Sequence, residues 1–155
     1  MENSIEKITN TENIQRSKLE RLLVDLKFDY KKLNVDHDDD FDELYEVHID
    51  LDKIGQIKII FLQSNNGKDL FTMCQNIYIL KENDSVLSIL SALNKANSKL
   101  SGGSVTLDDE GYVKYRRLDQ FDRTDSITKV KLLNIFNDII ASIIYTADEI
   151  NNLER

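Results

Sequence analysis

The segment 84–150 constrains the fold of this chain more than any other part. It predicts a helix that ends at Gly102-Gly103, then a pair of strands, then a long and very apolar helix from about Ser126. The first helix is indicated by apolar residues at helical spacing, namely Val86, Ile89, Leu90, Leu93, Ala96 and Leu100. The strand pair is expected at 104–107 and 112–118. Because this helix–hairpin–helix unit contains no catalytic group, it indicates a protein that works through its surfaces.

The preceding part of the chain predicts one helix and four strands. The helix is expected over 14–26, with Thr11 as a candidate for its N-terminal cap. Its apolar stripe consists of Leu19, Leu22, Leu23 and Leu26. The strands are expected at 28–35, 44–51, 56–63 and 70–80. The Asn66-Gly67 pair tolerates the positive φ angles of a tight hairpin turn. Short turns join these strands, so the predicted order α-β-β-β-β-α-β-β-α belongs to an α+β fold with a mainly antiparallel sheet.

Residue spacing also predicts which side chains share a face of a strand. The strand 56–63 is apolar on both faces, which is typical of a central strand. In the strand 70–80, four apolar side chains are expected to lie mostly on one face: Phe71, Met73, Ile77 and Ile79.

Length and charge narrow the class of protein. The 155 residues predict one domain at 13–153 after a flexible lead-in at 1–12. The formal net charge of −8 argues against nucleic-acid binding, which relies on clustered Lys and Arg. No apolar run approaches the roughly 20 residues of a membrane span, and no secretory signal is expected. The single Cys74 fits a reducing compartment, so we expect a cytoplasmic protein without a membrane partner.

The final helix has an unusually wide apolar surface. Its main stripe consists of Val130, Leu133, Phe136, Ile140, Ile143, Ile144 and Ala147. Other apolar positions widen the arc to roughly 220°: Leu132, Ile135, Ile139 and Ile150. One face of a sheet rarely covers so wide an arc. Either the helix is sandwiched inside the domain, or part of it contacts another chain.

The residues that could carry chemistry do not form a recognisable site. The acidic segment 36–43 fails the calcium-loop pattern, because its sixth and twelfth positions lack Gly and Glu in either register. His37, His48 and Cys74 lack the paired spacing of a zinc site. No phosphate-binding loop and no nucleophile elbow occur. We therefore expect no catalytic residue, no metal and no cofactor, and a protein that is not an enzyme.

Aromatic and basic residues occur together only in the strand 112–118. Alternation places Tyr112, Lys114 and Arg116 on one side of this strand, and the other side holds Val113, Tyr115 and Arg117. Tyr and Arg are enriched at protein interfaces. This side of the strand is therefore either an outward basic face or a contact surface.

The sequence resembles the YbjN-like family. The resemblance rests on Leu93-Asn94-x-x-Asn97 before a small-residue turn, on Asp108-x-x-Gly111 between two strands, and on a closing helix after Asp125-Ser126. It covers residues 14–150, and its motifs have low specificity because each one is also good helix-stop or hairpin chemistry.

The resemblance implies a fold similar to type III secretion chaperones, which is a twisted antiparallel sheet with helices packed mainly on one side. Proteins of this kind are small, acidic, commonly dimeric and non-enzymatic, and they bind protein partners through apolar sheet and helix surfaces. Members of the YbjN-like family are described as regulators. No catalytic residue transfers from the family, because it offers none.

The combined prediction is a chaperone-like adaptor or regulator that forms a homodimer and binds a protein partner. The second stripe of the last helix is the candidate surface for self-association: Leu132, Ile135 and Ile139. The candidates for partner contact on the sheet are Phe71, Ile60 and Leu62, together with Tyr112 and Arg116. The alternative is an acidic stoichiometric inhibitor, such as an immunity protein of a toxin, which the net charge and the acidic segment 36–43 would suit.

Overall fold

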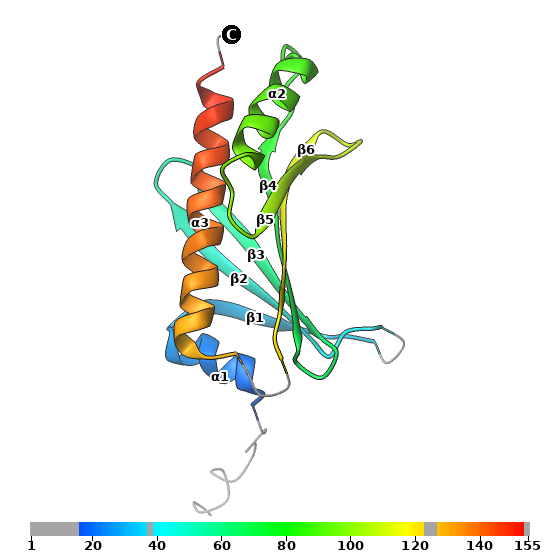
Figure 1. Ribbon diagram of the computed structural model, residues 1–155, viewed down its shortest axis with the longest axis vertical. Coiled ribbons are helices and arrows are strands. Elements are labelled where there is room, and N and C mark those ends of the chain that lie inside the picture. Colours follow the sequence, from blue (N-terminus) through cyan, green and yellow to red (C-terminus); the bar gives the residue numbers. More distant parts are fainter. Residues whose placement is uncertain (1–15, 37–38, 123–126, 154–155) are drawn as a thin grey trace, which may run out of the picture.

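The computed structural model describes residues 16–36, 39–122 and 127–153, in which three helices accompany one six-stranded sheet (Figure 1). The helices are α1 (Lys18–Asp25), α2 (Val86–Asn97) and α3 (Lys129–Asn151). The strands are β1 (Asp29–Leu33), β2 (Glu43–Leu51), β3 (Gly55–Ser64), β4 (Asp69–Ile79), β5 (Gly103–Leu107) and β6 (Tyr112–Gln120). This order confirms the predicted α+β fold class. The expected lead-in at 1–12 and the Asp125-Ser126 pair lie outside the described residues.

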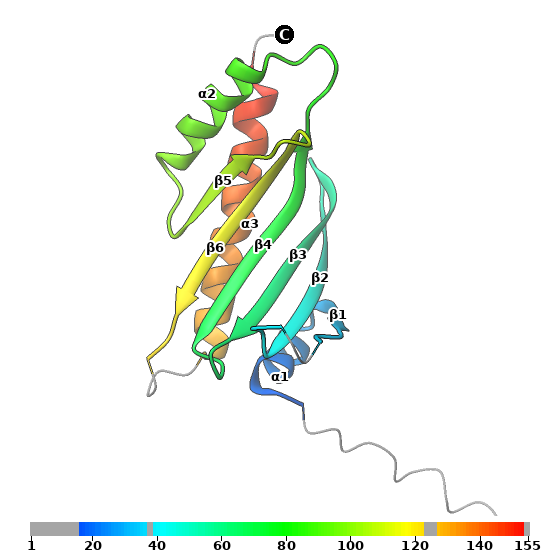
Figure 2. The same ribbon diagram turned by 90° about the vertical axis from the view of Figure 1, so that its right-hand side faces the viewer.

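All neighbouring strands in the sheet are antiparallel, in the spatial order β1-β2-β3-β4-β6-β5. β1 and β5 are the edge strands, and β3 and β4 lie in the middle. α1 and α3 lie on one side of the sheet, and α2 packs against α3 beside β5 (Figure 1). Figure 2 looks onto the opposite side of the sheet, which no helix of the described residues crosses. We call these two sides the covered face and the open face.

Each helix begins at a residue whose hydroxyl accepts a hydrogen bond from the backbone. Ser17 Oγ accepts from Glu20 N at 3.1 Å, and Ser85 Oγ accepts from Ser88 N at 3.3 Å. Thr128 caps α3 in the same way. Such caps satisfy N–H groups that have no partner within the helix. α1 therefore begins at Lys18, and the predicted cap Thr11 lies outside the described residues.

The turn between β3 and β4 adopts the conformation that its sequence predicts. Asn65, Asn66 and Gly67 all have positive φ angles, of 55°, 55° and 79°. Gly67 N donates to Ser64 O at 3.1 Å. This turn fixes the register of the two central strands, so that Leu62 lies opposite Phe71.

The core lies between the covered face and the helices α1 and α3. Tyr45, Phe61 and Tyr115 are its largest sheet residues, and α1 contributes Leu19 and Leu23, all of them fully buried. The Leu19 and Leu23 stripe of α1 was predicted from spacing and is confirmed.

β4 contains an irregularity at Asn76 that changes which side chains share a face. Asn76 has a φ of 63°, and the register with β6 shifts between Cys74 and Tyr78. Such a bulge adds unpaired residues to one strand and interrupts the alternation locally: residues 75–77 lie opposite Lys114 alone, and Ile79 beyond them returns to the side of Phe71 and Met73. The prediction that Phe71, Met73, Ile77 and Ile79 share a face is therefore wrong for Ile77, which is buried.

α3 is rotated relative to the sequence prediction. Its second stripe, expected to contact another chain, is buried within the molecule: Leu132, Ile135 and Ile139 are 0%, 6% and 0% exposed. Val130 and Leu133, expected in the core, are 68% and 40% exposed. The wide apolar arc thus belongs to a helix that packs on the sheet, and these three residues are not available as an exposed interface.

Two hydroxyl side chains explain why the pattern was misleading. Ser142 Oγ donates to Asp138 O at 2.7 Å, and Thr146 Oγ1 donates to Ser142 O at 2.7 Å. Both residues are buried. Their burial costs little because a hydroxyl that donates to the carbonyl four residues earlier in the helix needs no hydrogen bond to water. The sequence pattern treats both residues as polar, so the predicted main stripe is correct only in part: Ile143 and Ala147 are buried, whereas Val130 and Leu133 are exposed.

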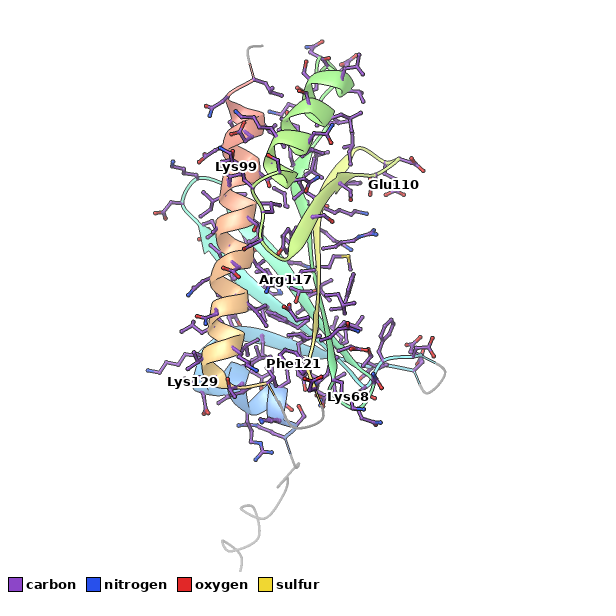
Figure 3. The ribbon with its side chains drawn as sticks, viewed as in Figure 1. Lys68, Lys99, Glu110, Arg117, Phe121 and Lys129 are labelled. Carbon is purple, nitrogen blue, oxygen red and sulfur yellow. The ribbon has the colours of Figure 1, made fainter. Side chains whose placement is uncertain are left out.

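β6 is tied to α3 by a largely buried arginine. Arg117, which is labelled in Figure 3, forms two hydrogen bonds to Asp119, at 2.7 and 2.8 Å, and a third to Asp138 of α3 at 3.2 Å. Burial disfavours the charged form, but the hydrogen bonds to Asp119 outweigh it and raise the pKa of Arg117. This network holds the covered face of β6 against the helix.

Candidate interaction surface

The open face of the sheet carries a continuous row of apolar side chains. Each member lies directly opposite the next on the neighbouring strand, from β1 through β2, β3 and β4 to β6. The row, which we call the apolar row, consists of Leu33, Leu44, Leu62, Phe71 and Leu118. Neighbouring strands lie about 4.8 Å apart, so the row extends for about 20 Å. Antiparallel sheets with one wet face normally carry polar residues there, which makes this row a candidate contact surface.

A second row on the same face extends the apolar area. Ile60 lies opposite Met73, two residues along the strands from the apolar row. Charged side chains flank the pair: Glu46 lies opposite Ile60, and Arg116 lies opposite Met73. We call the apolar row together with Ile60 and Met73 the sheet-face patch. Leu118 is 55% exposed, and the other members are partly exposed.

The structure brings together the predicted site residues of the sheet. Ile60, Leu62 and Phe71 belong to the sheet-face patch, although the sequence left open which of them point outward. Arg116 lies beside Met73, and Tyr112 lies further along the same face of β6. The predicted site residues of the last helix do not join them, because Leu132, Ile135 and Ile139 are buried on the opposite side of the sheet.

The sequence did not identify four members of the patch as contact residues: Leu33, Leu44, Met73 and Leu118. The signal that could have found Leu44 is the register of the short hairpins, which sets Leu44 opposite Leu62. Leu118 could not be found in this way, because β4 and β6 are separated in sequence by α2 and β5.

An ion-pair cluster borders the patch on the side away from the β3–β4 turn. His48 Nε2 lies 2.6 Å from Glu46 Oε1, and Lys58 Nζ lies 3.4 Å from the same oxygen. The hydrogen bonds from His48 and Lys58 lower the pKa of Glu46. Arg116 and Lys31 lie at the two ends of the same row, and neither forms an ion pair or hydrogen bond with another described residue. Both cations are therefore available to a partner.

The edge at β5 is protected by the side chain of Asn97. Its Nδ2 donates to Val105 O at 2.9 Å, and its Oδ1 accepts from Val105 N at 2.7 Å. Asn97 thus satisfies both outward backbone groups of Val105, as a further strand would. A side chain that occupies the outward backbone groups of an edge strand in this way disfavours the addition of another strand. The second Asn of the Leu93-Asn94-x-x-Asn97 motif therefore has a structural role.

The edge at β1 is also poorly suited to strand addition. β1 has only five residues, and three of them are charged, namely Asp29, Lys31 and Lys32. Lys32 bridges Glu43 at 3.2 Å and Glu20 of α1 at 3.6 Å. Short strands with Lys side chains are a common protection of sheet edges. The open face is thus a better candidate than either edge for binding a partner.

The Asp108-x-x-Gly111 motif shapes the turn between β5 and β6. Asp108 Oδ1 accepts from Tyr112 N at 2.8 Å and from Glu110 N at 3.1 Å, and Lys114 pairs with the other carboxylate oxygen. Gly111 has a φ of 86°, which favours glycine. The ion pair with Lys114, followed by the backbone hydrogen bonds, lowers the pKa of Asp108. This second motif is also structural.

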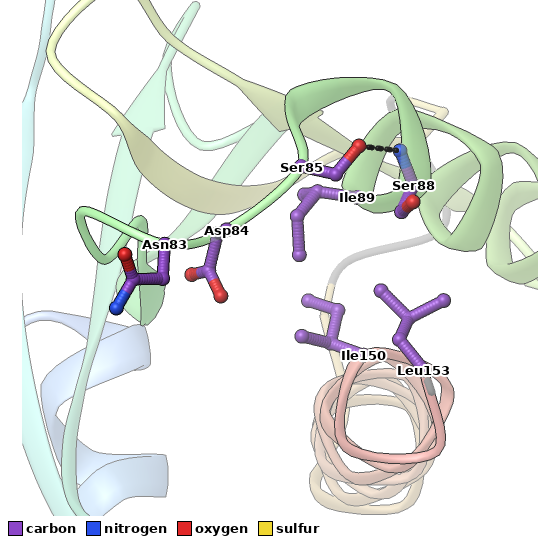
Figure 4. A pocket seen from close by; sticks show the side chains of 7 residues that line it. All are labelled: Asn83, Asp84, Ser85, Ser88, Ile89, Ile150 and Leu153. Atoms are coloured by element: carbon purple, nitrogen blue, oxygen red, sulfur yellow. Dashed lines mark hydrogen bonds between the residues drawn. The ribbon is translucent and has the colours of Figure 1, made fainter. Parts of the chain in front are cut away.

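A pocket lies between the β4–α2 loop and the ends of α2 and α3 (Figure 4). Its lining consists of Asn83, Asp84, Ser85, Ser88, Ile89, Ile150 and Leu153. Its volume of about 170 Å³ is below the roughly 300 Å³ of typical ligand sites. Asp84 accepts hydrogen bonds from Tyr78 Oη at 2.6 Å and from Lys81 N at 2.8 Å, so its carboxylate orders the loop.

The candidate metal and thiol groups are dispersed. No cluster of His, Cys, Asp and Glu suited to a metal occurs among residues 16–36, 39–122 and 127–153, and His37 lies outside them. Cys74 is fully buried, and burial raises the pKa of its thiol to about 12. The interpretation of Cys74 as a buried, inert thiol agrees with this position.

α3 is long and apolar enough to cross a membrane by length and composition alone. Core helices pass the same test, and the buried stripe of α3 packs on the sheet. The absence of a membrane partner stays a prediction.

No protein-family model matches the sequence, and no curated protein matches it. The fold is similar to the crystal structure of YbjN from E. coli, which is described as "a putative transcription regulator". The TM-score is 0.53 with 15% sequence identity, and the alignment covers 86% of this chain and 88% of that chain. The predicted YbjN-like fold is thus confirmed, whereas the likeness to type III secretion chaperones stays a prediction. Similarity at this identity shows the fold and leaves function to be argued from the surface.

Proposed function

We propose that this chain is a non-enzymatic module that binds a protein partner through the sheet-face patch. The observation that carries the proposal is the apolar row, whose members line up across adjacent strands on a face that no described helix covers. Contiguous apolar area on a monomer surface commonly marks an interaction site.

The surroundings of the patch support a protein partner. Apolar side chains at the centre, with Arg and Tyr around them, form the usual composition of a protein interface. Arg116 and Tyr112 occupy such positions on β6. Burial of the apolar row would supply the affinity, and the exposed cations Lys31 and Arg116 would orient an acidic part of the partner. A chaperone-like adaptor or a regulator would both act in this way.

A matched pair of variants tests this proposal. Leu118→Asp places a charge on the sheet-face patch, and Leu133→Asp places one on the outer side of α3; the two leucines are 55% and 40% exposed. Tagged proteins would capture partners from the native cell at low and high salt, with identification by mass spectrometry. We expect wild type and Leu133→Asp to retain one abundant partner at high salt, and Leu118→Asp to lose it.

Two outcomes would count against the proposal. Equal capture by both variants would place the binding surface elsewhere. A basic partner that is lost at high salt and is unaffected by Leu118→Asp would instead favour the acidic inhibitor, because exposed ion pairs are screened by salt. Circular dichroism of each variant would confirm that it is folded.

A further inference from the structure

The charges around the apolar row are divided between its two sides. Asp69 lies two residues along β4 from Phe71, on the side of the β3–β4 turn. Asp42 is at the same end, where its carboxylate accepts a hydrogen bond from Gly67 N at 3.2 Å. On the other side lie Lys31 and Arg116. Glu46 lies in the same row as Lys31 and Arg116, but it is already paired with His48 and Lys58. The patch therefore has an acidic side and a side with cations that are unpaired among the described residues, with apolar side chains between them.

Such a surface is complementary to itself under one symmetry operation. A two-fold axis that lies in the interface, parallel to the apolar row, places the row of one copy on the row of a second copy. The same rotation carries the acidic side of each copy onto the opposite side of the other. It also places each strand over the same strand of the other copy. Symmetric dimers use a single self-complementary surface in this way.

The register identifies which charges would meet. Asp69 is on β4 and Arg116 is on the neighbouring strand β6, one row on either side of the apolar row. After the rotation, Asp69 of one copy lies about one strand spacing of 4.8 Å from Arg116 of the other, across a sheet separation of about 10 Å. A long Arg side chain spans such a gap.

The same rotation would place Asp42 over Glu46 of the second copy. The repulsion between these carboxylates is reduced because Glu46 already pairs with His48 and Lys58. Lys31, one strand away and without a partner among the described residues, would face Asp42. Lys114 is held by Asp108.

The size of the face also suits a dimer. Six strands at about 4.8 Å spacing, with central strands about 30 Å long, give a face of about 24 by 30 Å. That is about 700 Å², close to the roughly 800 Å² per partner of standard protein interfaces.

We infer that a second copy of this chain packs on the sheet-face patch, about a two-fold axis parallel to the apolar row. The inference rests on the proposed function, in that both use the open face as a binding surface. It moves the predicted homodimer contact from the buried stripe of α3 to the sheet. The second copy and the partner then share one surface.

A charge-reversal experiment tests the two-fold arrangement. Asp69→Lys sets two cations against each other at both symmetric contacts, and Arg116→Glu sets two anions against each other. Each variant alone is expected to sediment as a monomer of about 18 kDa at concentrations where wild type is a dimer. An equimolar mixture restores both attractive contacts, so we expect the mixture to form dimers that contain one copy of each variant.

Matched controls place the same charge changes outside the patch. Asp109→Lys is in the β5–β6 turn and Lys129→Glu is at the start of α3, and both positions are exposed. These variants are expected to dimerise like wild type, alone and when mixed. Circular dichroism would verify that every variant is folded.

The inference is overturned if wild type sediments as a monomer throughout the micromolar range. It is also overturned if both patch variants still dimerise, or if their mixture stays monomeric. Any of these results leaves the proposed function standing as long as Leu118→Asp loses the captured partner. The opposite combination of results is also informative. If the mixture forms dimers but Leu118→Asp does not affect partner capture, the dimer is supported and the proposed partner surface is rejected.

Discussion

The two faces of the sheet are built from alternate residues of the same strands, and they differ in what covers them. Along β3, Ile59 and Phe61 are fully buried under the helices, whereas Ile60 and Leu62 lie on the open face. These four neighbours have nearly the same hydropathy. Their surroundings rather than their chemistry decide which of them stabilise the fold and which remain partly exposed at the surface.

The two faces also differ in what explains their apolar residues. A domain must bury the covered face in order to fold, so apolar residues there follow from stability alone. Leu62 and Leu118 lie on the side of the sheet that no helix of the described residues covers, so burial under a helix does not explain their apolar character. An apolar row in that position therefore supports the proposal that another molecule binds this face.

The largest expected effect is the loss of folding when a charge enters the covered face. Ile139→Asp buries an unpaired carboxylate at a position that is 0% exposed, and we expect a loss of about 4 kcal/mol or more of unfolding free energy. Leu118→Asp on the open face should change the unfolding free energy of the monomer by no more than about 0.5 kcal/mol, measured at a protein concentration where wild type does not dimerise. Urea unfolding followed by circular dichroism measures both. Equal losses would mean that the two faces do not differ as described.

Thiol reactivity gives a second contrast between the faces. Cys74 lies on the covered face with a pKa of about 12, so its thiolate is scarce at neutral pH. A cysteine at exposed position 106, introduced as Thr106→Cys with Cys74→Ala, should react about 100-fold faster or more with a thiol reagent. Fast labelling of native Cys74 would show that the covered face opens readily.

The edge of the sheet offers a third contrast. Asn97→Ala removes both side-chain hydrogen bonds to Val105 and should cost about 1–3 kcal/mol of stability. Asn94→Ala, at an exposed position of the same helix, should change stability by less than about 0.5 kcal/mol. Thermal unfolding measures both variants. Association that appears only in Asn97→Ala would indicate pairing through the β5 edge, distinct from the open face.

The smallest expected effect is on the unfolding free energy at acid pH, through Asp108 in the turn between β5 and β6. The ion pair with Lys114 and the backbone hydrogen bonds lower the pKa of Asp108 below its ordinary value of 3.8. Its stabilising contribution is therefore fully present above that value and is lost as pH falls through the lower, folded-state pKa. Urea unfolding of wild type and Asp108→Asn from pH 6 to pH 2 should show a slightly smaller acid loss for the variant. An identical pH dependence would contradict this assignment.

The sequence predicted the element order, the antiparallel sheet and the turn at Asn66-Gly67, because spacing and turn chemistry are local properties. It failed at Asn76, where a bulge interrupts the alternation and buries Ile77, and in part on α3, where Ser142 and Thr146 satisfy their hydroxyls within the helix. Neither feature is visible in hydropathy alone.

The candidate site could be predicted only in part. Ile60, Leu62 and Phe71 were identified as outward candidates, and Arg116 and Tyr112 from composition. Which side of the sheet the helices cover depends on long-range packing of α1 and α3, so the stripe of Leu132, Ile135 and Ile139 was assigned to the wrong surface. Leu118 joins the apolar row only through the pairing of β4 with β6.

Site-specific photo-crosslinking in the native cell tests the central claim most directly. A photoreactive residue would replace Leu118 on the open face in one protein and Leu133 on the outer side of α3 in another. We predict discrete crosslinked species from position 118, to the protein partner and to a second copy of the chain, and none of comparable yield from position 133. Crosslinks from position 133 alone, or equal yields of the same species from both positions, would contradict the assignment of the open face as the binding surface.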